Sequence, residues 1–163
     1  MKECDEFQYM IQTEVTPNRL KSFVVEDTLE DCLVIDDVSK ISVTNDVGQN
    51  VTEQFQISTE GQHIVCNARQ EYLQDEAFTD NQVYTFTLRV HRRPETEIDA
   101  SRYLTEDGYT IFVPNHATMS YERGNGTGGT MDTETVWVKG IIPPELEVSK
   151  NTSRYEWMTG CLL

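Results

Sequence analysis

Two polar side chains lie in stretches whose neighbours indicate a buried strand face, and they are the strongest candidates for chemistry. Asn115, in "VPNHATMSY", shares a strand face with Ala117, Met119 and Tyr121, because alternate residues of a strand point the same way. Asp27 ends the β-branched run of "FVVEDTLEDCL". A buried polar group must find partners or cost a few kcal/mol. From the residues alone, the simpler interpretations are an asparagine bonded to neighbouring backbone and an aspartate that caps a turn.

Other catalytic and metal-binding patterns do not occur in the sequence. "RGNGTGG" lacks the Lys-Ser/Thr of a phosphate-binding loop and is predicted to form a hairpin loop. The acidic stretches "EDTLED" and "IDDVS" lack the D-x-D-x-D-G calcium pattern and are expected to be solvated loops. With no GxSxG motif and no Cys–His pair, the chain is predicted not to be an enzyme and to need no cofactor. No metal site is predicted, because the histidines have no HxxxH or HExxH spacing. These histidines are His63, His91 and His116.

The four cysteines form no CxxC pair and no zinc spacing: Cys4, Cys32, Cys66 and Cys161. Cys32 and Cys66 fall in or beside predicted strands and are interpreted as small buried residues. The sequence leaves open whether these two form a disulfide.

Charge and composition limit the classes of partner. The 163 residues are 37% hydrophobic and 25% charged, so the chain can bury a core. Lys and Arg total 13 against 28 Asp and Glu, a formal charge of −15. Nucleic acid and anionic membrane are therefore not expected as partners, because phosphate binding needs clustered cations. No apolar run approaches the roughly 18 residues of a membrane span, and "MKECDEFQYM" lacks a signal-peptide core, so export signals are expected outside this chain.

The elements that must position Asn115 and Asp27 are strands, because the apolar residues repeat every second position. In "VYTFTLRVH", Tyr84, Phe86, Leu88 and Val90 face one way. Only "QEYLQDEAF" indicates a helix, near residues 71–78. Strands at roughly ten-residue spacing predict an all-β, Ig-like antiparallel β-sandwich with one short helix. The predicted strands are 6–13, 22–27, 32–36, 40–44, 54–58, 63–68, 83–91, 109–113, 115–121 and 133–138.

The order of these pieces resembles the fimbrial isopeptide-forming D2 domain of Gram-positive pilins and surface adhesins. "EFQYMIQTEVTPNRLKSFVVEDTLEDCLVI" is similar to the family's opening "YxI" strand, turn and "D-T/x-L-P-x-x-L" strand end, with Glu30 where the family usually has proline. "YTFTLRVH" is similar to its long middle strand. "VPNHATMSY" followed by "TETVWV" is similar to its closing strand pair. The resemblance covers about residues 5–139.

The resemblance implies an autocatalytic bond between a lysine amine and an asparagine carboxamide. Asn115 matches the acceptor and Asp27 matches the general acid. Such chemistry requires a lysine whose pKa burial has lowered, and a buried acid that polarises the carboxamide and moves protons. The family's donor lysine stands further from the "YxI" motif than Lys2 does from Tyr9. The donor is therefore expected upstream of this chain, with Lys2 as a poor substitute.

The resemblance also implies a tandem arrangement. Residues 1–140 would be one module with a truncated first strand, and 141–163 would be a proline linker at Pro143-Pro144 and the first strand of the next module, with Lys150 as that module's donor. The chain is thus expected to be a structural module of an extracellular adhesin or pilus in the Gram-positive cell wall, with neighbouring modules as partners. The alternative is a module that binds a host protein or glycan through loops such as "RGNGTGG" and "RRPETEID". A third interpretation is an accessory domain of a secreted enzyme.

Overall fold

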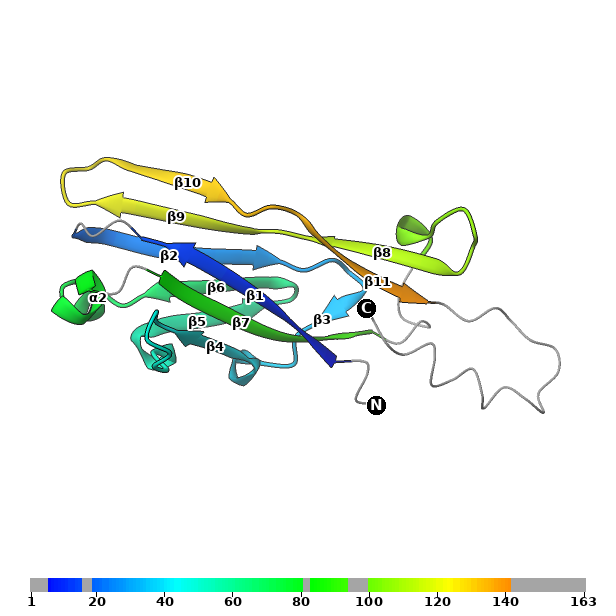
Figure 1. Cartoon of the computed structure of the whole chain (residues 1–163), viewed down its shortest axis with the longest axis horizontal. Helices are drawn as coiled ribbons and strands as arrows, with labels where there is room; N and C mark the ends of the chain where they lie inside the picture. Colours follow the sequence, from blue (N-terminus) through cyan, green and yellow to red (C-terminus); the bar gives the residue numbers. More distant parts are fainter. Residues whose placement is uncertain (1–5, 16–18, 81–82, 94–99, 142–163) are drawn as a thin grey trace.

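Most of the strands form two facing antiparallel sheets (Figure 1) in the computed structural model, which describes residues 6–15, 19–80, 83–93 and 100–141. In one sheet, the central strand β7 pairs with β1, β3 and β4. The strands of this sheet are β1 (Glu6–Glu14), β3 (Leu33–Val34), β4 (Ile41–Thr44) and β7 (Val83–Arg92). The second sheet has the order β10-β9-β2-β6-β5. Its strands are β2 (Leu20–Thr28), β5 (Phe55–Glu60), β6 (His63–Ala68), β9 (Ala117–Arg123) and β10 (Gly128–Asp132). The predicted antiparallel β-sandwich is confirmed.

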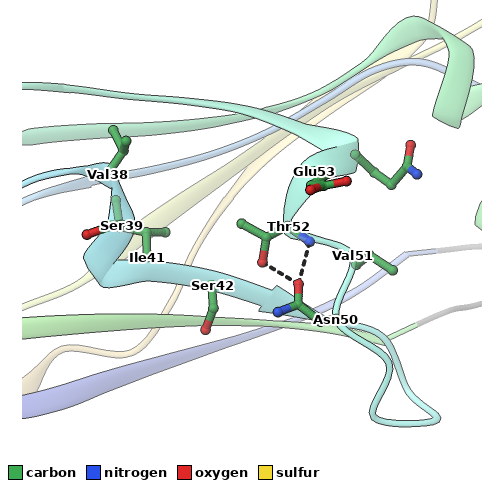
Figure 2. A pocket seen from close by; sticks show the side chains of 9 residues that line it. Val38, Ser39, Ile41, Ser42, Asn50, Val51, Thr52 and Glu53 are labelled. Atoms are coloured by element: carbon green, nitrogen blue, oxygen red, sulfur yellow. Dashed lines mark hydrogen bonds between the residues drawn. The ribbon is translucent and has the colours of Figure 1, made fainter.

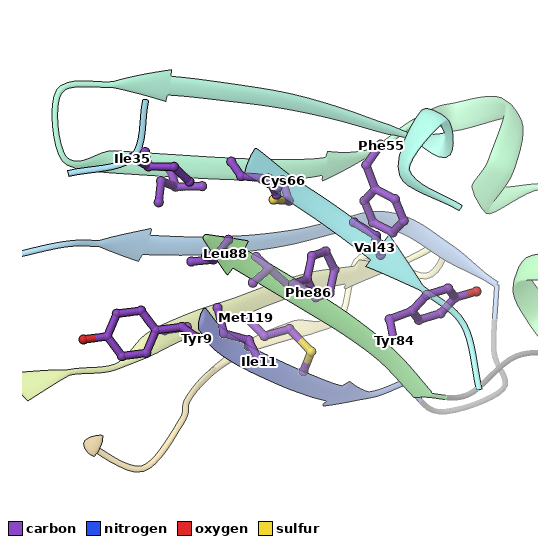
Figure 3. Close-up of a cluster of buried hydrophobic side chains, with 14 of the residues drawn as sticks. Tyr9, Ile11, Ile35, Val43, Phe55, Cys66, Tyr84, Phe86, Leu88 and Met119 are labelled. Atoms are coloured by element: carbon purple, nitrogen blue, oxygen red, sulfur yellow. The ribbon is translucent and has the colours of Figure 1, made fainter. Parts of the chain in front are cut away.

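The core lies between the two sheets, where the two-residue period of the strands places their apolar side chains (Figure 3). On β7 the side chains predicted to share one face, from Tyr84 to Val90, are all buried, with at most 1% exposed. On β1, Tyr9 and Ile11 point inward in the same way. Each predicted strand range contains a strand. Burial of the apolar face also fixes the register in which these strands pair.

An aromatic cluster fills one end of the core. Phe23 of β2 is fully buried, and its ring centroid lies within 6.2 Å of the centroids of Phe55, Phe78, Tyr84 and Phe86. These rings come from both sheets and from the helical segment, and most meet edge to face, the arrangement that aromatic pairs favour. The cluster therefore joins the two layers at the end of the sandwich that carries the helices.

The predicted helix is two short helices, α1 (Gln70–Leu73) and α2 (Glu76–Asp80). Asp75 interrupts the segment, because its Oδ1 accepts a hydrogen bond from the backbone N–H of Ala77 and so begins a new helix. The prediction of a single helix was wrong on this point. Single 3-10 turns are found at Val38–Lys40, Thr52–Gln54 and Ala100–Tyr103.

Two long strand pairs carry the C-terminal part of the described chain. β8 (Thr110–Asn115) continues into β9 after His116, and β10 continues into β11 (Val136–Ile141). β9 pairs with β10, whereas β8 and β11 pair with each other as a separate two-stranded ribbon that extends beyond β2 (Figure 1). The prediction missed β10, because its sequence, "GGTMD", is exposed throughout and has no apolar alternation.

Cys32 and Cys66 are both buried and free, so they form no disulfide. Burial raises the pKa of the Cys66 thiol to about 12, and this keeps it protonated and unreactive. Lys2, Lys150 and the predicted boundary at Pro143-Pro144 lie outside the described residues.

Replacing Phe86 with alanine should lower the free energy of unfolding by about 3–5 kcal/mol, because it removes a fully buried ring from the aromatic cluster. Thr87→Ala is the control, since Thr87 is the next residue of β7, on the opposite face, and should cost less than about 1 kcal/mol. Urea denaturation of both variants tests this. Equal losses for the two would contradict the inward orientation of Phe86.

Candidate functional site

Asp27 lies on the central strand of the five-stranded sheet, with its side chain directed into the core. In β2 the residues Phe23, Val25 and Asp27 alternate inward, and Asp27 is only 3% exposed. Its direct partners across the sheet are Ile64 of β6 and Ala117 of β9. The carboxyl group is thus held between apolar neighbours by the register of three strands.

Asn115 is the last residue of β8 and faces the same interior. It is 5% exposed and stands two residues before Ala117, which pairs directly with Asp27. Asn115 is therefore a diagonal neighbour of Asp27. Its Nδ2 donates a hydrogen bond of 2.8 Å to Oδ2 of Asp27. The structure brings together the two polar residues that the sequence singles out, although they are 88 positions apart.

Burial is the main influence on the Asp27 carboxyl group, and it raises the pKa to about 6 from an ordinary value of 3.8. The hydrogen bond from Asn115 and the charge of His116 act in the opposite direction but do not cancel the effect of burial. Asp27 can therefore gain or lose a proton near neutral pH, which is the property that a general acid needs.

Three buried polar atoms around this pair have no hydrogen-bond partner among the described residues: Asp27 Oδ1, Asn115 Oδ1 and Tyr9 Oη. Buried polar groups are nearly always paired, so such a cluster indicates a functional role. The sequence did not identify Tyr9 as a site residue, because it sits on the apolar face of β1 and looks like an ordinary core aromatic. Burial, and then the charge of Asp27, raises the pKa of the Tyr9 phenol.

A cavity of about 370 Å³ lies beside Asn115. One wall is β1, and the other is formed by two junctions: His116, between β8 and β9, and Thr133, between β10 and β11. Tyr9, Asn115, Thr133 and Val136 are among the residues that line it. Thr133 holds the two junctions together. Its backbone N–H donates to the carbonyl oxygen of Ala117 and its hydroxyl oxygen accepts from the N–H of Ala117, both at 2.9 Å. Among the described residues β1 pairs only with β7, so the cavity lies along an edge of a sheet.

A second, larger depression of about 620 Å³ lies between the 3-10 turn at Val38–Lys40 and the chain around Thr52 (Figure 2). Its polar groups bond to one another: Asn50 Oδ1 accepts from the backbone N–H and hydroxyl of Thr52, and the same hydroxyl accepts from the N–H of Val43. This depression has no buried titratable group, so we place the candidate site at Asp27 and Asn115.

Two of the three histidines each lie beside a carboxylate. His91 Nε2 lies 2.7 Å from Asp36 Oδ1, and His63 Nε2 lies 3.6 Å from Glu26 Oε1. No cluster of three or more potential metal ligands is found within the described ranges. None of the helices described is long and apolar enough to cross a membrane.

The fold is an antiparallel β-sandwich of the kind seen in pilins and adhesins of Gram-positive bacteria. BcpA, the major pilin subunit of Bacillus cereus, matches with a TM-score of 0.61 at 20% identity, over 81% of this chain and 33% of that chain. Domains D2 and D3 of the major pilin SpaD from Corynebacterium diphtheriae match with a TM-score of 0.56 at 16% identity, over 83% and 47% of the two chains. ACE19, the collagen-binding subdomain of the Enterococcus faecalis surface protein ACE, matches at 0.51 and 10% identity, over 83% and 88%.

At these identities the likeness is one of fold. The chain spans about a third of the length of BcpA. No protein-family model matches the sequence, and no curated protein matches it.

Asp27→Asn should change how stability depends on pH. Because the folded pKa, about 6, is above the ordinary 3.8, the folded state binds the proton more tightly, and the wild type loses stability as pH rises from about 4 through about 6. The variant lacks this loss. Over that pH range, the free energy of unfolding of the variant should therefore rise by about 3 kcal/mol relative to that of the wild type.

Urea denaturation at several pH values measures this difference. Asp31→Asn is the control, because the Asp31 side chain is 78% exposed and solvent screens its ion pair with Arg102. If wild type and Asp27→Asn lose stability in parallel as pH rises, the Asp27 carboxyl group does not titrate as argued.

Proposed function

We propose that this chain is a structural module of a Gram-positive surface adhesin or pilus protein, stabilised in the full-length protein by an autocatalytic bond between a lysine and Asn115. The observation that carries the proposal is the buried hydrogen bond between Asp27 and Asn115 beside a cavity at the edge of β1. An acid with a raised pKa touching a carboxamide is the arrangement that this reaction requires. The resemblance in sequence and the pilin-like fold support the same assignment.

The cavity suits the arrival of a lysine on an additional strand. The outer edge of β1 has no strand partner among the described residues, and Asn115 and Tyr9 both line the cavity next to it. A lysine amine in this cavity would lie beside Tyr9 and Asn115, whose Oη and Oδ1 atoms have no partner among the described residues, and its N–H groups would supply donors for them. As the sequence resemblance implies, this lysine comes from a strand upstream of residue 1, with Lys2 as the only lysine before β1 in the present chain.

In the reaction the neutral lysine Nζ attacks Cγ of Asn115. A new C–N bond forms, the bond from Cγ to Nδ2 breaks, and the nitrogen leaves as ammonia with a proton that comes from the lysine amine by way of Asp27. Burial lowers the pKa of a lysine and so supplies the neutral amine. The fold holds the groups in contact, which replaces a collision by a high effective concentration.

The protonation state of Asp27 decides how the carboxamide is oriented. An ionised Asp27 can only accept, so Nδ2 of Asn115 faces it, as in the hydrogen bond observed. A protonated Asp27 can donate, and the carboxamide, turned by half a rotation, then presents Oδ1 to the acid. This second arrangement polarises the carbonyl for attack, and a pKa of about 6 makes both states accessible.

The bond forms once per chain, so it is a maturation step and not enzyme turnover. It would close a long loop and restrict the unfolded chain, for a stabilisation of about 4–5 kcal/mol by the loop-entropy estimate. Because it is an amide, reduction would not break it. Such a cross-link between distant strands suits a module that bears tension in a pilus or stalk, next to other modules of the same protein on the cell surface.

The alternative is a module that binds a host protein or glycan through its loops. The fold permits it, since a collagen-binding subdomain is among the similar structures. The hairpin loop at 124–127 is short, however, and Asn125 there bonds within the loop, to the N–H and hydroxyl of Thr127. The polar groups of this loop are thus used within the loop. The buried hydrogen bond between Asp27 and Asn115 favours the structural role.

The mass of the protein tests the proposal directly. A chain extended upstream to include the preceding strand should lose one ammonia, and it should unfold at a higher temperature than the present chain because a long loop is closed. Asn115→Ala should abolish the mass loss, because it removes the electrophile, and Asp27→Ala should slow or stop it. Asn67→Ala is the control, since this asparagine is exposed on β6 and its loss should leave the reaction intact.

The present chain should show its full calculated mass in the same measurement. A loss of ammonia without the extension would make Lys2 the donor. An extended chain that folds normally and keeps its ammonia would refute the covalent bond and leave an uncross-linked spacer module.

A further inference from the structure

An apolar face lies on the outer side of the β8–β11 ribbon. Along β8 the residues Ile111 and Val113 are buried, whereas Phe112 between them is 40% exposed. On β11, Trp137 is 61% exposed, while Val138 after it is buried. We call the outward set Phe112, Pro114 and Trp137 the ribbon face.

The register makes the ribbon face contiguous. Trp137 pairs directly with Pro114, and Lys139 pairs with Phe112. Trp137 and Phe112 are therefore diagonal neighbours on the same side, a separation that aromatic side chains can span. The face thus presents two aromatic rings and a proline, with the exposed Lys139 beside them.

The outward faces of β7 and β9 are polar, and Met10 is a single exposed apolar side chain on the outward face of β1. β9 directs Thr118, Ser120 and Glu122 outward, and β7 presents Thr85, Thr87 and Arg89 in the same way. This is the usual pattern for an antiparallel sheet with one solvated side. The ribbon face departs from it, and a contiguous exposed apolar surface of this kind marks a contact with another part of the protein or with a partner.

The position of the ribbon indicates what covers it. β11 ends at Ile141, only four residues after Trp137, and residues 142–163 follow directly. A chain spans about 3.3–3.6 Å per residue when extended, so this segment is long enough to turn and run back over the ribbon. It supplies apolar groups for the contact: Pro143, Pro144, Leu146, Val148, Tyr155 and Trp157.

The charges agree with this occupant. Lys139 is the exposed cation on the ribbon face in a chain of net charge −15. The first charged residues after Ile141 are Glu145 and Glu147, which flank Leu146. A segment that places Leu146 on the aromatic rings would bring these carboxylates near Lys139.

We propose that residues 142–163 of this chain dock on the ribbon face and cover Trp137. This role for Leu146 and Val148 differs from the first strand of a next module that the sequence resemblance implies. The contact would fix the direction in which the chain leaves the sandwich, and so the angle between this module and whatever follows it. It does not depend on the bond to Asn115, which lies on the inner side of the same ribbon.

Tryptophan fluorescence of the full chain tests the docking, because Trp137 and Trp157 are its two tryptophans. Trp157→Phe leaves Trp137 as the sole reporter. In this variant the Trp137 emission should be blue-shifted relative to a free indole, and acrylamide should quench it weakly. Adding Leu146→Ser and Val148→Ser should shift the emission to the red and raise the quenching constant, because these changes remove the apolar groups that cover the ring.

Met131→Ser in the Trp157→Phe background is the matched control. Met131 is 60% exposed on β10, outside the ribbon face, so its loss should leave emission and quenching unchanged. Trp137 quenched as strongly as a free indole in the full chain would overturn the proposal. Protection of Trp137 from acrylamide that survives the two serine substitutions but disappears on dilution of the protein would also overturn the proposal. A second copy of the chain would then be what covers the ribbon face.

Discussion

The pairing of β2 with β9 is the constraint on which the candidate site depends. Asp27 stands opposite Ala117, and Asn115, two residues earlier on the same face, then reaches the Asp27 carboxyl group. A slip of one residue in this register would turn one of the two side chains to the opposite face of the sheet. The apolar residues that alternate with them, such as Val25 and Met119, prevent the slip because it would expose them. The core therefore determines the geometry of the polar pair.

The same pair is a cost to the fold. A carboxyl group with a pKa raised to about 6 is destabilising whenever it is ionised, and the unpaired Oδ1 atoms of Asp27 and Asn115 add to the cost. Proteins retain such features where function requires them. The aromatic cluster around Phe23 lies at the other end of the sandwich and supplies packing that offsets this cost. Stability and the candidate site thus occupy separate regions of one core.

The two proposals concern opposite sides of one ribbon. The inner side carries Asn115 toward the cavity and β1, and the outer side carries the ribbon face toward the chain that follows. β8 and β11 pair only with each other among the described strands, and a two-stranded ribbon needs further packing to be stable. A strand that filled the cavity would support the ribbon from within, and a docked segment would support it from outside. In a pilus or stalk, both contacts would stiffen the place where one module leads to the next.

The sequence by itself determined which segments are strands and which side chains point inward. The alternation in "VYTFTLRVH" and in "NHATMSY" is a local property, because successive residues of a strand face opposite sides and burial selects the apolar one. This was enough to place Asn115 inside and to predict the sandwich. It was not enough for β10, whose residues are all exposed, or for the break that Asp75 makes between α1 and α2.

Only the tertiary structure decided that Asp27 and Asn115 touch, that Tyr9 belongs to the same site, and that a cavity lies beside them. These facts depend on strand order and register between segments up to 88 residues apart, and no local pattern encodes them. The exposure of Trp137 has the same origin. The alternation of β11 assigns Trp137 and Val138 to opposite sides, but the fold alone decides which side of the ribbon packs on the core.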